Sequence, residues 1–287
     1  MPTFNRANLI EATIASLLKQ TYAAIEIIVV DDHSTDNTAA VIDRLTKLDK
    51  RIQYHQRPNS KPKGANACRN FGLELATGTF VKWIDSDDLL SADAIQLQLD
   101  AINKEHTDVC ICKTSIFTDE NKLSFIKNWG DLNKPATPIG FITEGFRFHT
   151  CAGLWRKSFF DNATPWDEAQ MNSQEWLMHF QQLCKNITIV KCNEYLSFAR
   201  YHASNMSNRK NKRGAYYYNE CTARIKAIAF AQKQKIPSLA LYKKLTKELY
   251  WYFLFVIYKG APAKALRLMP SLFKNVRYLF TNTNPSA

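Results

Sequence analysis

Hydrophobic and polar positions follow two different periods along the first hundred residues. Helical stripes, in which apolar residues recur every three or four positions, are separated by short apolar runs typical of buried strands. The run 25–30, for example, is apolar except for Glu26. Helices that alternate with buried strands predict an α/β fold with a largely parallel sheet. The predicted elements are helix 8–18, strand 25–30, helix 36–47, strand 51–56, helix 65–76, strand 80–84, helix 91–105 and strand 109–114.

The pattern changes after residue 115. Residues 116–170 are irregular and rich in aromatic and turn residues, which is typical of a variable substrate-binding region. A helix over 173–185 and a strand over 187–190 follow, and the chain beyond residue 213 is predicted to be entirely helical. The apolar run 249–258 is only about half as long as the roughly twenty residues that a membrane span needs, so no transmembrane helix is predicted.

The composition predicts a globular protein in a reducing compartment. The chain has 287 residues, of which 46% are hydrophobic, enough to bury a sizeable core. Its seven cysteines include no C-x-x-C pair, and free thiols favour the cytosol. Cys110 and Cys112 point to the same side of a predicted strand and are interpreted as small buried hydrophobes, not as a metal pair. We find no signal peptide.

The net charge is +12, and the excess of Lys and Arg is concentrated after residue 205. A basic surplus favours nucleic acid, an anionic membrane or a phosphorylated substrate as partner. The C-terminal basic residues are interleaved with large apolar ones and no nucleic-acid motif is present, so nucleic acid is not expected. We predict amphipathic helices on an anionic membrane surface, and a cytoplasmic protein peripheral to the inner face of the plasma membrane. The alternative is helices that pack on the domain with solvated lysines outward.

Two apolar runs end in carboxylates, and these are the strongest chemical signal in the chain. Asp31 and Asp32 follow the first run, and three more aspartates follow the run that starts at residue 80. Ligands of open α/β sheets bind at the carboxyl ends of the strands. Clustered carboxylates repel one another, and a bound Mg²⁺ or Mn²⁺ ion is the simplest way to offset this repulsion. Local capping is the favoured role for Asp36, which precedes a helix, and is an open alternative for Asp31 and Asp32.

Four motifs in order resemble those of glycosyltransferase family 2 over about residues 1–115, with weaker similarity to about residue 205. They are Pro2-Thr3-Phe4-Asn5-Arg6, Val29-Val30-Asp31-Asp32-His33-Ser34-Thr35-Asp36, Gly64-Ala65-Asn66-Ala67-Cys68-Arg69-Asn70 and Asp85-Ser86-Asp87-Asp88. The resemblance implies a GT-A fold, which is a Rossmann-like, mostly parallel sheet flanked by helices. It also implies a nucleotide-sugar donor, a Mn²⁺ or Mg²⁺ cofactor and an inverting sugar transfer.

The resemblance assigns roles by position. The residues expected to bind the nucleotide-sugar are Pro2, Thr3 and Asn5 at the nucleoside, Asp32 at the base (most often uracil), Asn66 and Arg69 at base, ribose or phosphates, and Asp85 with Ser86 at the ribose or donor sugar. Asp87, with Asp88 as the alternative, would hold the metal. His202 would bind the metal or a phosphate. A cation at this place would offset the negative charge that develops on the leaving diphosphate.

The catalytic base is expected at the start of the helix predicted over 173–185. Glu175 stands where the family commonly has Asp, and Gln174 replaces the usual first acid of the pair. The alternative for Glu175 is a charge that complements the helix dipole. Asp167 and Glu168 are competitors that are often structural in relatives. Trp155 is a candidate for contact with the acceptor, with Trp176 and His149 as further candidates, although core packing is the favoured use of each aromatic.

The predicted organisation is a GT-A domain over 1–205 and a basic amphipathic helical extension over 206–287. Within the domain, residues 1–115 would bind the nucleotide-sugar and 116–205 the acceptor. Family members usually have an apolar strand just before the first motif, whereas Met1 directly precedes Pro2 here, so the first strand is expected to be missing. The predicted function is transfer of a sugar from a nucleotide-sugar to a glycan or lipid-linked acceptor in surface polysaccharide biosynthesis. The alternative is a non-catalytic module that binds nucleotide-sugar or membrane.

Overall fold

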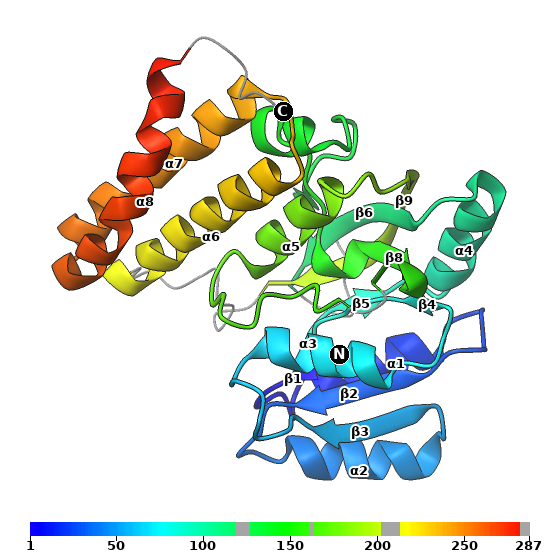
Figure 1. Cartoon of the computed structure of the whole chain (residues 1–287). Helices are drawn as coiled ribbons and strands as arrows, with labels where there is room; N and C mark the ends of the chain where they lie inside the picture. The colour runs from blue at the N-terminus through cyan, green and yellow to red at the C-terminus, as the bar shows by residue number, and fades with distance from the viewer. Residues whose placement is uncertain (119–126, 161–162, 202–212, 282–287) are drawn as a thin grey trace. The chain divides into compact units, whose positions relative to one another are not determined.

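The structure, a computed structural model, describes residues 1–118, 127–160, 163–201 and 213–281, which fall into two compact units (Figure 1). The first unit comprises Met1–Leu132, Arg147–Ala169 and Thr188–His202, and the second comprises Asn133–Phe146, Gln170–Ile187 and Ala203–Ala287. The chain therefore passes between the units several times. The boundary predicted at residue 205 divides a catalytic domain from a basic helical extension, and it does not coincide with the division into compact units. It remains a prediction about function.

A parallel three-stranded sheet forms the beginning of the first unit. Its strands are β1 (Pro2–Thr3), β2 (Ile27–Asp31) and β3 (Ile52–Gln56), in the order β1-β2-β3. The first strand, which was expected to be missing, is thus present as two residues that pair with Val30 and Asp31. The helices α1 (Ile10–Leu18), α2 (Thr38–Leu48) and α3 (Ala65–Leu75) alternate with these strands, α2 packing on β3 and α3 on β1 and β2. The parallel strands end at one edge, where Asp31 and Asp32 lie.

Glu26, the polar exception in the run 25–30, has a specific partner. Its Oε1 accepts hydrogen bonds from the backbone N–H groups of Thr77 and Gly78, at 2.7 and 2.9 Å. Burial opposes ionisation of Glu26, but these hydrogen bonds outweigh it and hold its pKa below the ordinary value. Glu26 therefore connects the segment before β2 to the turn at Thr77 and Gly78, which leads into the strand that begins at Phe80.

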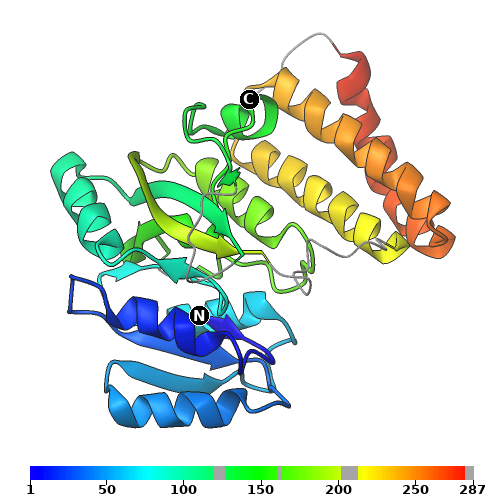
Figure 2. The ribbon, with the colours of Figure 1, turned by 180° about the vertical axis from the view of Figure 1, so that it is seen from behind.

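The second sheet of this unit is mixed. Its order is β4-β8-β6-β9-β5, with β7 paired to β6. The strands are β4 (Phe80–Val81), β5 (Leu89–Leu90), β6 (Val109–Phe117), β7 (Lys127–Trp129), β8 (Gly153–Arg156) and β9 (Ile189–Arg200). Among the strands of this sheet that the structure describes, only β6 and β9 pair in parallel. The α/β class is confirmed, although parallel pairing within the described residues is confined to β1–β3 and this one pair. The helix α4 (Ala94–Glu105) packs on β6, β8 and β9 (Figure 2).

The strand predicted over 80–84 is shorter than expected. β4 ends at Val81, and the chain then runs to the carboxylates without strand pairing. Trp83 and Ile84 are nevertheless buried, Trp83 with its ring edge-on to Trp166 and Phe160. The apolar residues of this run are therefore buried in a loop, not in a strand, and the acidic turn follows directly after this loop.

Cys110 and Cys112 are buried in β6, which confirms their interpretation as small hydrophobes.

The second unit is mainly helical. It contains the π-helix η1 (Gly140–Glu144) and the helices α5 (Gln174–Leu183), α6 (Gly214–Lys233), α7 (Leu239–Tyr258) and α8 (Pro262–Phe280). α6 packs on α5, α7 and α8. The remaining short elements, the 3₁₀ helices η2 (Thr150–Ala152) and η3 (Lys157–Phe160), belong to the first unit. Within the described residues, no helix combines the length and the apolarity that crossing a membrane requires.

Candidate functional site

The end of β2 holds two aspartates with different surroundings. Asp31 Oδ1 accepts from the backbone N–H and the hydroxyl of Ser34, at 3.0 and 2.6 Å. Its Oδ2 accepts from the hydroxyl of Tyr54 at 2.8 Å, and burial together with this hydrogen bond raises the pKa of Tyr54 to about 12. Asp31 is therefore the turn-forming residue of the pair.

Asp36 also has the capping role that was favoured for it, since its Oδ1 accepts a hydrogen bond from the N–H of Thr38 at 2.9 Å.

Asp32 is paired with a residue that the sequence analysis missed. Arg57 Nε donates to Asp32 Oδ1 at 2.5 Å, and both side chains are only 8% exposed. Arg57 directly follows β3, and its Nη1 also donates to the carbonyl groups of Pro58 and Lys61. The positions of the two residues in the sequence could have indicated this pair. β2 and β3 are parallel neighbours, so residues directly after their carboxyl ends lie at the same edge of the sheet.

The first residues of the chain lie against the same edge. Pro2 and Thr3 are buried in β1, and the N–H of Asp32 donates to the carbonyl of Thr3 at 2.9 Å. Asn5 has a left-handed backbone (φ 52°), and its side-chain Oδ1 accepts from the N–H of Thr35 at 2.8 Å. The structure thus brings together the residues predicted to surround the nucleoside.

Helix α3 connects to the acidic turn through Arg69. This side chain is 6% exposed and donates from Nη1 to Asn66 Oδ1 at 3.0 Å and from Nη2 to Asp85 Oδ1 at 2.7 Å. Burial opposes ionisation of Asp85, but the positive charges of Arg69 and His149 hold the pKa of Asp85 below its ordinary value. Arg69 is therefore a buried ion-pair partner and not a solvated helix residue. It also stacks on the ring of Trp166, 4.4 Å from the centroid.

Asp167 and Glu168, the competitors for the base, are also held against α3. The carbonyl of Asp167 accepts from Asn66 Nδ2 at 2.7 Å, and Glu168 Oε1 accepts from Asn70 Nδ2 at 2.9 Å. Asn70 further exchanges hydrogen bonds with the backbone of Trp166. These contacts favour a structural role for the acidic pair.

The turn Asp85-Ser86-Asp87-Asp88 concentrates three carboxylates whose exposure differs. The side chains of Asp85, Asp87 and Asp88 are 34%, 15% and 5% exposed, and Ser86 is buried. Arg6 Nε lies 3.6 Å from Asp87 Oδ2, and the N–H of Arg6 donates to Thr38 Oγ1 at 2.8 Å. Arg6 thus links the acidic turn to the start of α2. Arg200 fixes the turn from β9, donating its N–H to Asp88 Oδ1 at 3.0 Å and its Nε to the carbonyl of Asp87 at 2.8 Å.

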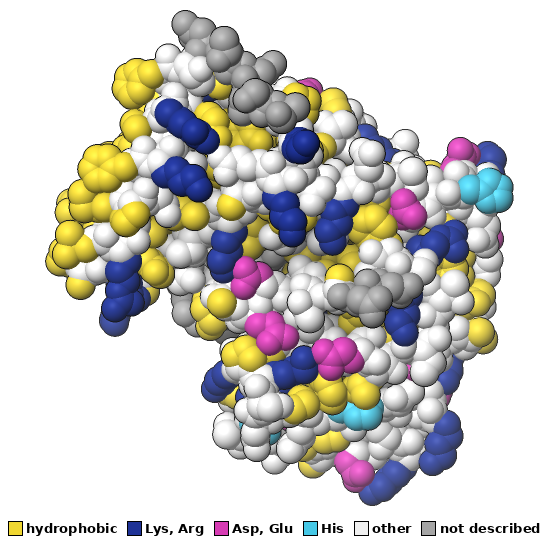
Figure 3. Space-filling model, viewed as in Figure 1, with side chains coloured by type: hydrophobic (Ala, Val, Ile, Leu, Met, Phe, Trp, Pro, Cys, Tyr) yellow, Lys and Arg dark blue, Asp and Glu magenta, His cyan; other side chains and the backbone are white. Residues whose placement is uncertain are grey.

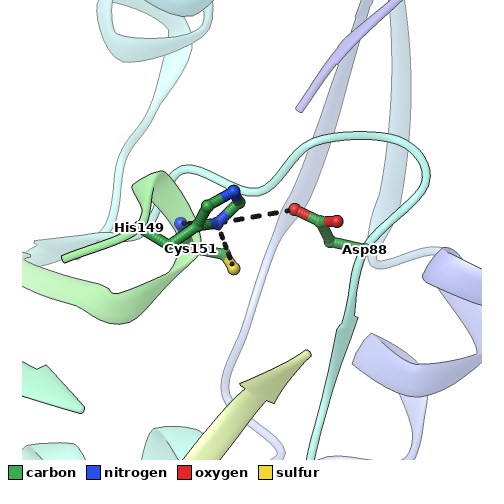
Figure 4. Close-up of side chains that lie close together, drawn as sticks. All are labelled: Asp88, His149 and Cys151. Atoms are coloured by element: carbon green, nitrogen blue, oxygen red, sulfur yellow. Dashed lines mark hydrogen bonds and ion pairs between the residues drawn. The ribbon is translucent and has the colours of Figure 1, made fainter. Parts of the chain in front are cut away.

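Asp88 faces His149 and Cys151, and Figure 4 shows these three side chains converging. His149 Nδ1 lies 3.7 Å from Asp88 Oδ2 and 3.0 Å from Cys151 Sγ. One potential ligand atom from each of the three residues lies within 4.8 Å of the other two. Burial and repulsion by Asp85 and Asp87 raise the pKa of Asp88 to about 7, although the charge of His149 opposes this.

These residues fit a divalent cation. Asp88 Oδ2 is buried and has no hydrogen-bond partner within the described structure, which is costly unless positive charge is supplied. Carboxylate oxygens, with an imidazole nitrogen beside them, are ligands that Mn²⁺ accepts. Burial raises the pKa of the Cys151 thiol to about 11, which favours the neutral thiol, a poor ligand for such an ion. His149 was predicted to face the acceptor, whereas the structure places it on Asp88.

Three predicted site residues need separate comment. His202 lies outside the described residues. Trp155 is 2% exposed and packs edge-on or tilted against Trp83, Phe148 and Phe160, so no face of its ring is open to a sugar. Its acceptor-binding role is therefore corrected to core packing. Glu175 belongs to the second unit, in the first turn of α5, and is partly exposed, as is its neighbour Trp176.

Comparison with known proteins identifies relatives. Residues 1–161 match the family model described as Glycosyl transferase family 2. Over 109 residues the chain is 40% identical to the GalNAc(5)-diNAcBac-PP-undecaprenol beta-1,3-glucosyltransferase of Campylobacter jejuni, which covers 38% of this chain and 35% of that protein. The chain spans about a fifth to a third of the length of the first curated relatives that it matches.

Solved structures share the fold over nearly the whole chain. TarS 1–349 of S. aureus in complex with UDP-GlcNAc superposes with a TM-score of 0.65 at 17% identity, covering 96% of this chain and 77% of that chain. The mannosyltransferase PcManGT from Pyrobaculum calidifontis, in complex with GDP-Man and Mn²⁺, gives a TM-score of 0.58 at 16% identity, covering 97% and 83%. At this identity the similarity establishes the GT-A type of fold.

Proposed function

Because the chain belongs to glycosyl transferase family 2, we propose that it is an inverting glycosyltransferase. It moves a sugar from a nucleotide-sugar, most simply a UDP-sugar, to a hydroxyl of a glycan or lipid-linked acceptor in surface polysaccharide biosynthesis. The observation that carries this proposal is the acidic turn 85–88, which Arg69 ties to Asn66 on α3 and Arg6 ties to Thr38 at the start of α2. TarS binds UDP-GlcNAc and the Campylobacter relative is named for an undecaprenol-linked substrate, which supports the classes of donor and acceptor.

The donor would bind along the edge formed by β1, β2 and the acidic turn. Pro2, Thr3 and Asn5 surround the nucleoside and Asp32 hydrogen-bonds the base. Arg57 supports this role because its hydrogen bond fixes the direction of the Asp32 carboxylate. Asn66, Arg69, Asp85 and Ser86 would face the ribose, the phosphates or the donor sugar. Arg69 supports this arrangement by holding Asp85 ionised.

Asp87 and Asp88 would hold a Mn²⁺ or Mg²⁺ ion, with His149 beside them and His202 as a further predicted ligand. When bound, the ion supplies positive charge to the leaving nucleoside diphosphate. The unsatisfied, buried Asp88 Oδ2 and the Mn²⁺ in the related PcManGT structure support this assignment. Arg6 and Arg200 keep the turn in place, Arg200 through its hydrogen bonds to Asp87 and Asp88.

Glu175 would act as the catalytic base. Its carboxylate takes the proton of the acceptor hydroxyl while the hydroxyl oxygen bonds to the anomeric carbon and the bond to the diphosphate oxygen breaks. Glu175 lies in the first turn of α5 and its side chain is partly exposed, which supports this role. Trp176, the predicted acceptor-binding residue next to it, is also partly exposed.

The decisive experiment is a calorimetric screen of UDP- and GDP-sugars with and without Mn²⁺, followed by transfer assays with lipid-linked acceptors. Donor binding that depends on Mn²⁺ and on Asp87, together with turnover that is lost in Glu175→Gln, is the expected result. Donor binding without hydrolysis or transfer would favour the alternative, a non-catalytic nucleotide-sugar-binding module. Absence of any donor binding would overturn the proposal.

We also propose that the second unit attaches to an anionic membrane surface on the cytoplasmic side. α7 and α8 leave large apolar side chains exposed, namely Trp251, Leu254, Ile257, Tyr258, Leu266, Met269, Phe273 and Phe280. On α8 the exposed Arg267, Lys274 and Arg277 lie beside this apolar surface, and α8 contains no acidic residue. Figure 3 shows yellow apolar and dark blue basic side chains together over these helices. Aromatic and aliphatic groups flanked by cations suit the interface of an anionic bilayer.

A further inference from the structure

A buried ion pair on α6 contacts the first turn of α5. Arg224 Nη1 donates to Glu220 Oε2 at 2.7 Å, and the two side chains are 8% and 5% exposed. Arg224 Nε also donates to Glu248 Oε2 on α7 at 3.0 Å. Loss of either partner would leave an uncompensated buried charge, so the geometry of such a pair is strongly held.

The ion pair holds Ser173, the N-cap residue directly before α5. The Ser173 hydroxyl donates to Glu220 Oε2 at 2.7 Å, and Arg224 Nη1 lies 3.4 Å from the same hydroxyl. Ser173 has a left-handed backbone with φ 52°, a conformation that costs free energy for a residue other than glycine. The hydrogen bond to Glu220 therefore fixes a strained start of the helix.

The same arginine holds the other side of Glu175. The Arg224 guanidinium lies over the ring of Trp176, 4.2 Å from its centroid. Trp176 also stacks with Phe180, with ring centroids 5.9 Å apart and an interplanar angle of 14°. Glu175 is thus flanked in the sequence by two residues, Ser173 and Trp176, that both contact Arg224.

α6 also fixes the segment that precedes Ser173. Gln170 Nε2 donates to the carbonyl of Asn219 at 2.8 Å, and Gln170 Oε1 accepts from Thr222 and Lys226. All of these residues belong to the second unit. The orientation of the first turn of α5 is therefore set by side chains some 50 positions later in the chain.

We infer that Glu220 and Arg224 are positioning residues that fix the direction of the Glu175 carboxylate. This inference rests on the proposed role of Glu175 as base. Catalysis is sensitive to such positioning, because a displacement of about 1 Å can lower the rate about 10²-fold. The C-terminal helical part then serves the chemical step in addition to any membrane contact.

The test uses Ser173→Gly and Glu220→Gln in the full chain. Glycine adopts φ 52° without strain, so we expect Ser173→Gly to keep or raise thermal stability. The substitution removes the hydroxyl that donates a hydrogen bond to Glu220. We expect both variants to lower kcat at least about 10-fold while the calorimetric Kd for the donor stays unchanged. Gln232→Ala is the matched control, because it removes a hydrogen bond from α6 to Tyr278 about three turns along α6 from Glu220, and we expect it to leave kcat unchanged.

A double-variant cycle separates this inference from the proposed function. In the Glu175→Gln background, Ser173→Gly and Glu220→Gln have no further effect on residual turnover if they act through Glu175. Equal fold-losses in both backgrounds would overturn the positioning role, as would wild-type kcat in the folded single variants. Normal transfer by Glu175→Gln itself would instead refute the base assignment. If Glu220→Gln loses its fold, Ser173→Gly still decides.

Discussion

Arg57 Nε donates a hydrogen bond to Asp32 Oδ1 at 2.5 Å, and each side chain is 8% exposed. The two residues follow neighbouring parallel strands, β3 and β2, at the same edge of the sheet. The pair compensates the charge of the aspartate proposed to recognise the nucleotide base. The same ion pair therefore contributes both to the stability of this edge of the sheet and to the proposed binding of the donor.

Removing one partner of this pair should be strongly destabilising. Arg57→Leu leaves a buried, uncompensated carboxylate, so we expect a loss of about 3–5 kcal/mol in the free energy of unfolding. The double variant Arg57→Leu/Asp32→Leu should regain much of that loss, because no buried charge remains. Urea denaturation of the three proteins measures this, and a double variant no more stable than Arg57→Leu would contradict the explanation.

Asp87→Asn should lose Mn²⁺-dependent donor binding. Loss of a ligand weakens binding of the ion that neutralises the diphosphate, so we expect donor affinity in the presence of Mn²⁺ to fall about 10²-fold or more. Calorimetry with a UDP-sugar, with and without Mn²⁺, measures the change. Asp100→Asn on the exposed side of α4 is the matched control and should bind as the unmodified chain does. Equal Mn²⁺ dependence in Asp87→Asn would remove Asp87 from the metal site.

Glu26→Gln should destabilise the protein at neutral pH but not in acid. The folded-state pKa of Glu26 is lowered, so its contribution is present above the pKa of the unfolded chain and is lost as pH falls through the folded pKa. We expect a loss of about 1 kcal/mol at pH 7, from weaker hydrogen bonds to Thr77 and Gly78, and almost none once the pH lies below the folded-state pKa of Glu26. Denaturation curves at several pH values measure the difference. A pH-independent difference would show that ionisation of Glu26 is irrelevant.

Trp155 should matter for stability and not for the acceptor. Trp155→Ala removes a fully buried indole, and we expect it to cost about 3–5 kcal/mol. The milder Trp155→Phe should leave the KM for the acceptor unchanged once the protein is folded. Unfolding curves and acceptor titrations give the two readouts. A selective rise in acceptor KM for Trp155→Phe would restore the original sequence-based prediction.

The basic residues of α8 should contribute to membrane binding. Each basic residue near an anionic surface is worth about 1 kcal/mol, so Arg267→Gln/Lys274→Gln should weaken binding roughly 30-fold. Flotation with vesicles containing anionic lipid, at low and high salt, measures this. Lys47→Gln/Lys50→Gln, with the same charge change in the first unit, is the control. Failure of the unmodified chain to bind at low salt would end the membrane proposal.

The sequence determined what depends on local patterns. Periodicity placed α1–α5 and β2–β3 within a few residues of their bounds, because the stripe of a helix and the apolar run of a strand are written over neighbouring positions. The capping role of Asp36 and the burial of Cys110 and Cys112 followed from the same short-range information. The acidic turn was also visible, since an apolar run followed at once by three carboxylates is a local feature.

Only the tertiary structure decided which distant side chains meet. Arg200 binds the acidic turn from 112 positions away, His149 joins Asp88, and Glu220 holds Ser173 from 47 positions later. The mixed pairing of β4–β9 and the burial of Trp155 are likewise products of long-range packing. Periodicity reports which face of an element is apolar, but it carries no information about the element that will cover that face. Pairings across such separations are therefore set by the folded chain as a whole.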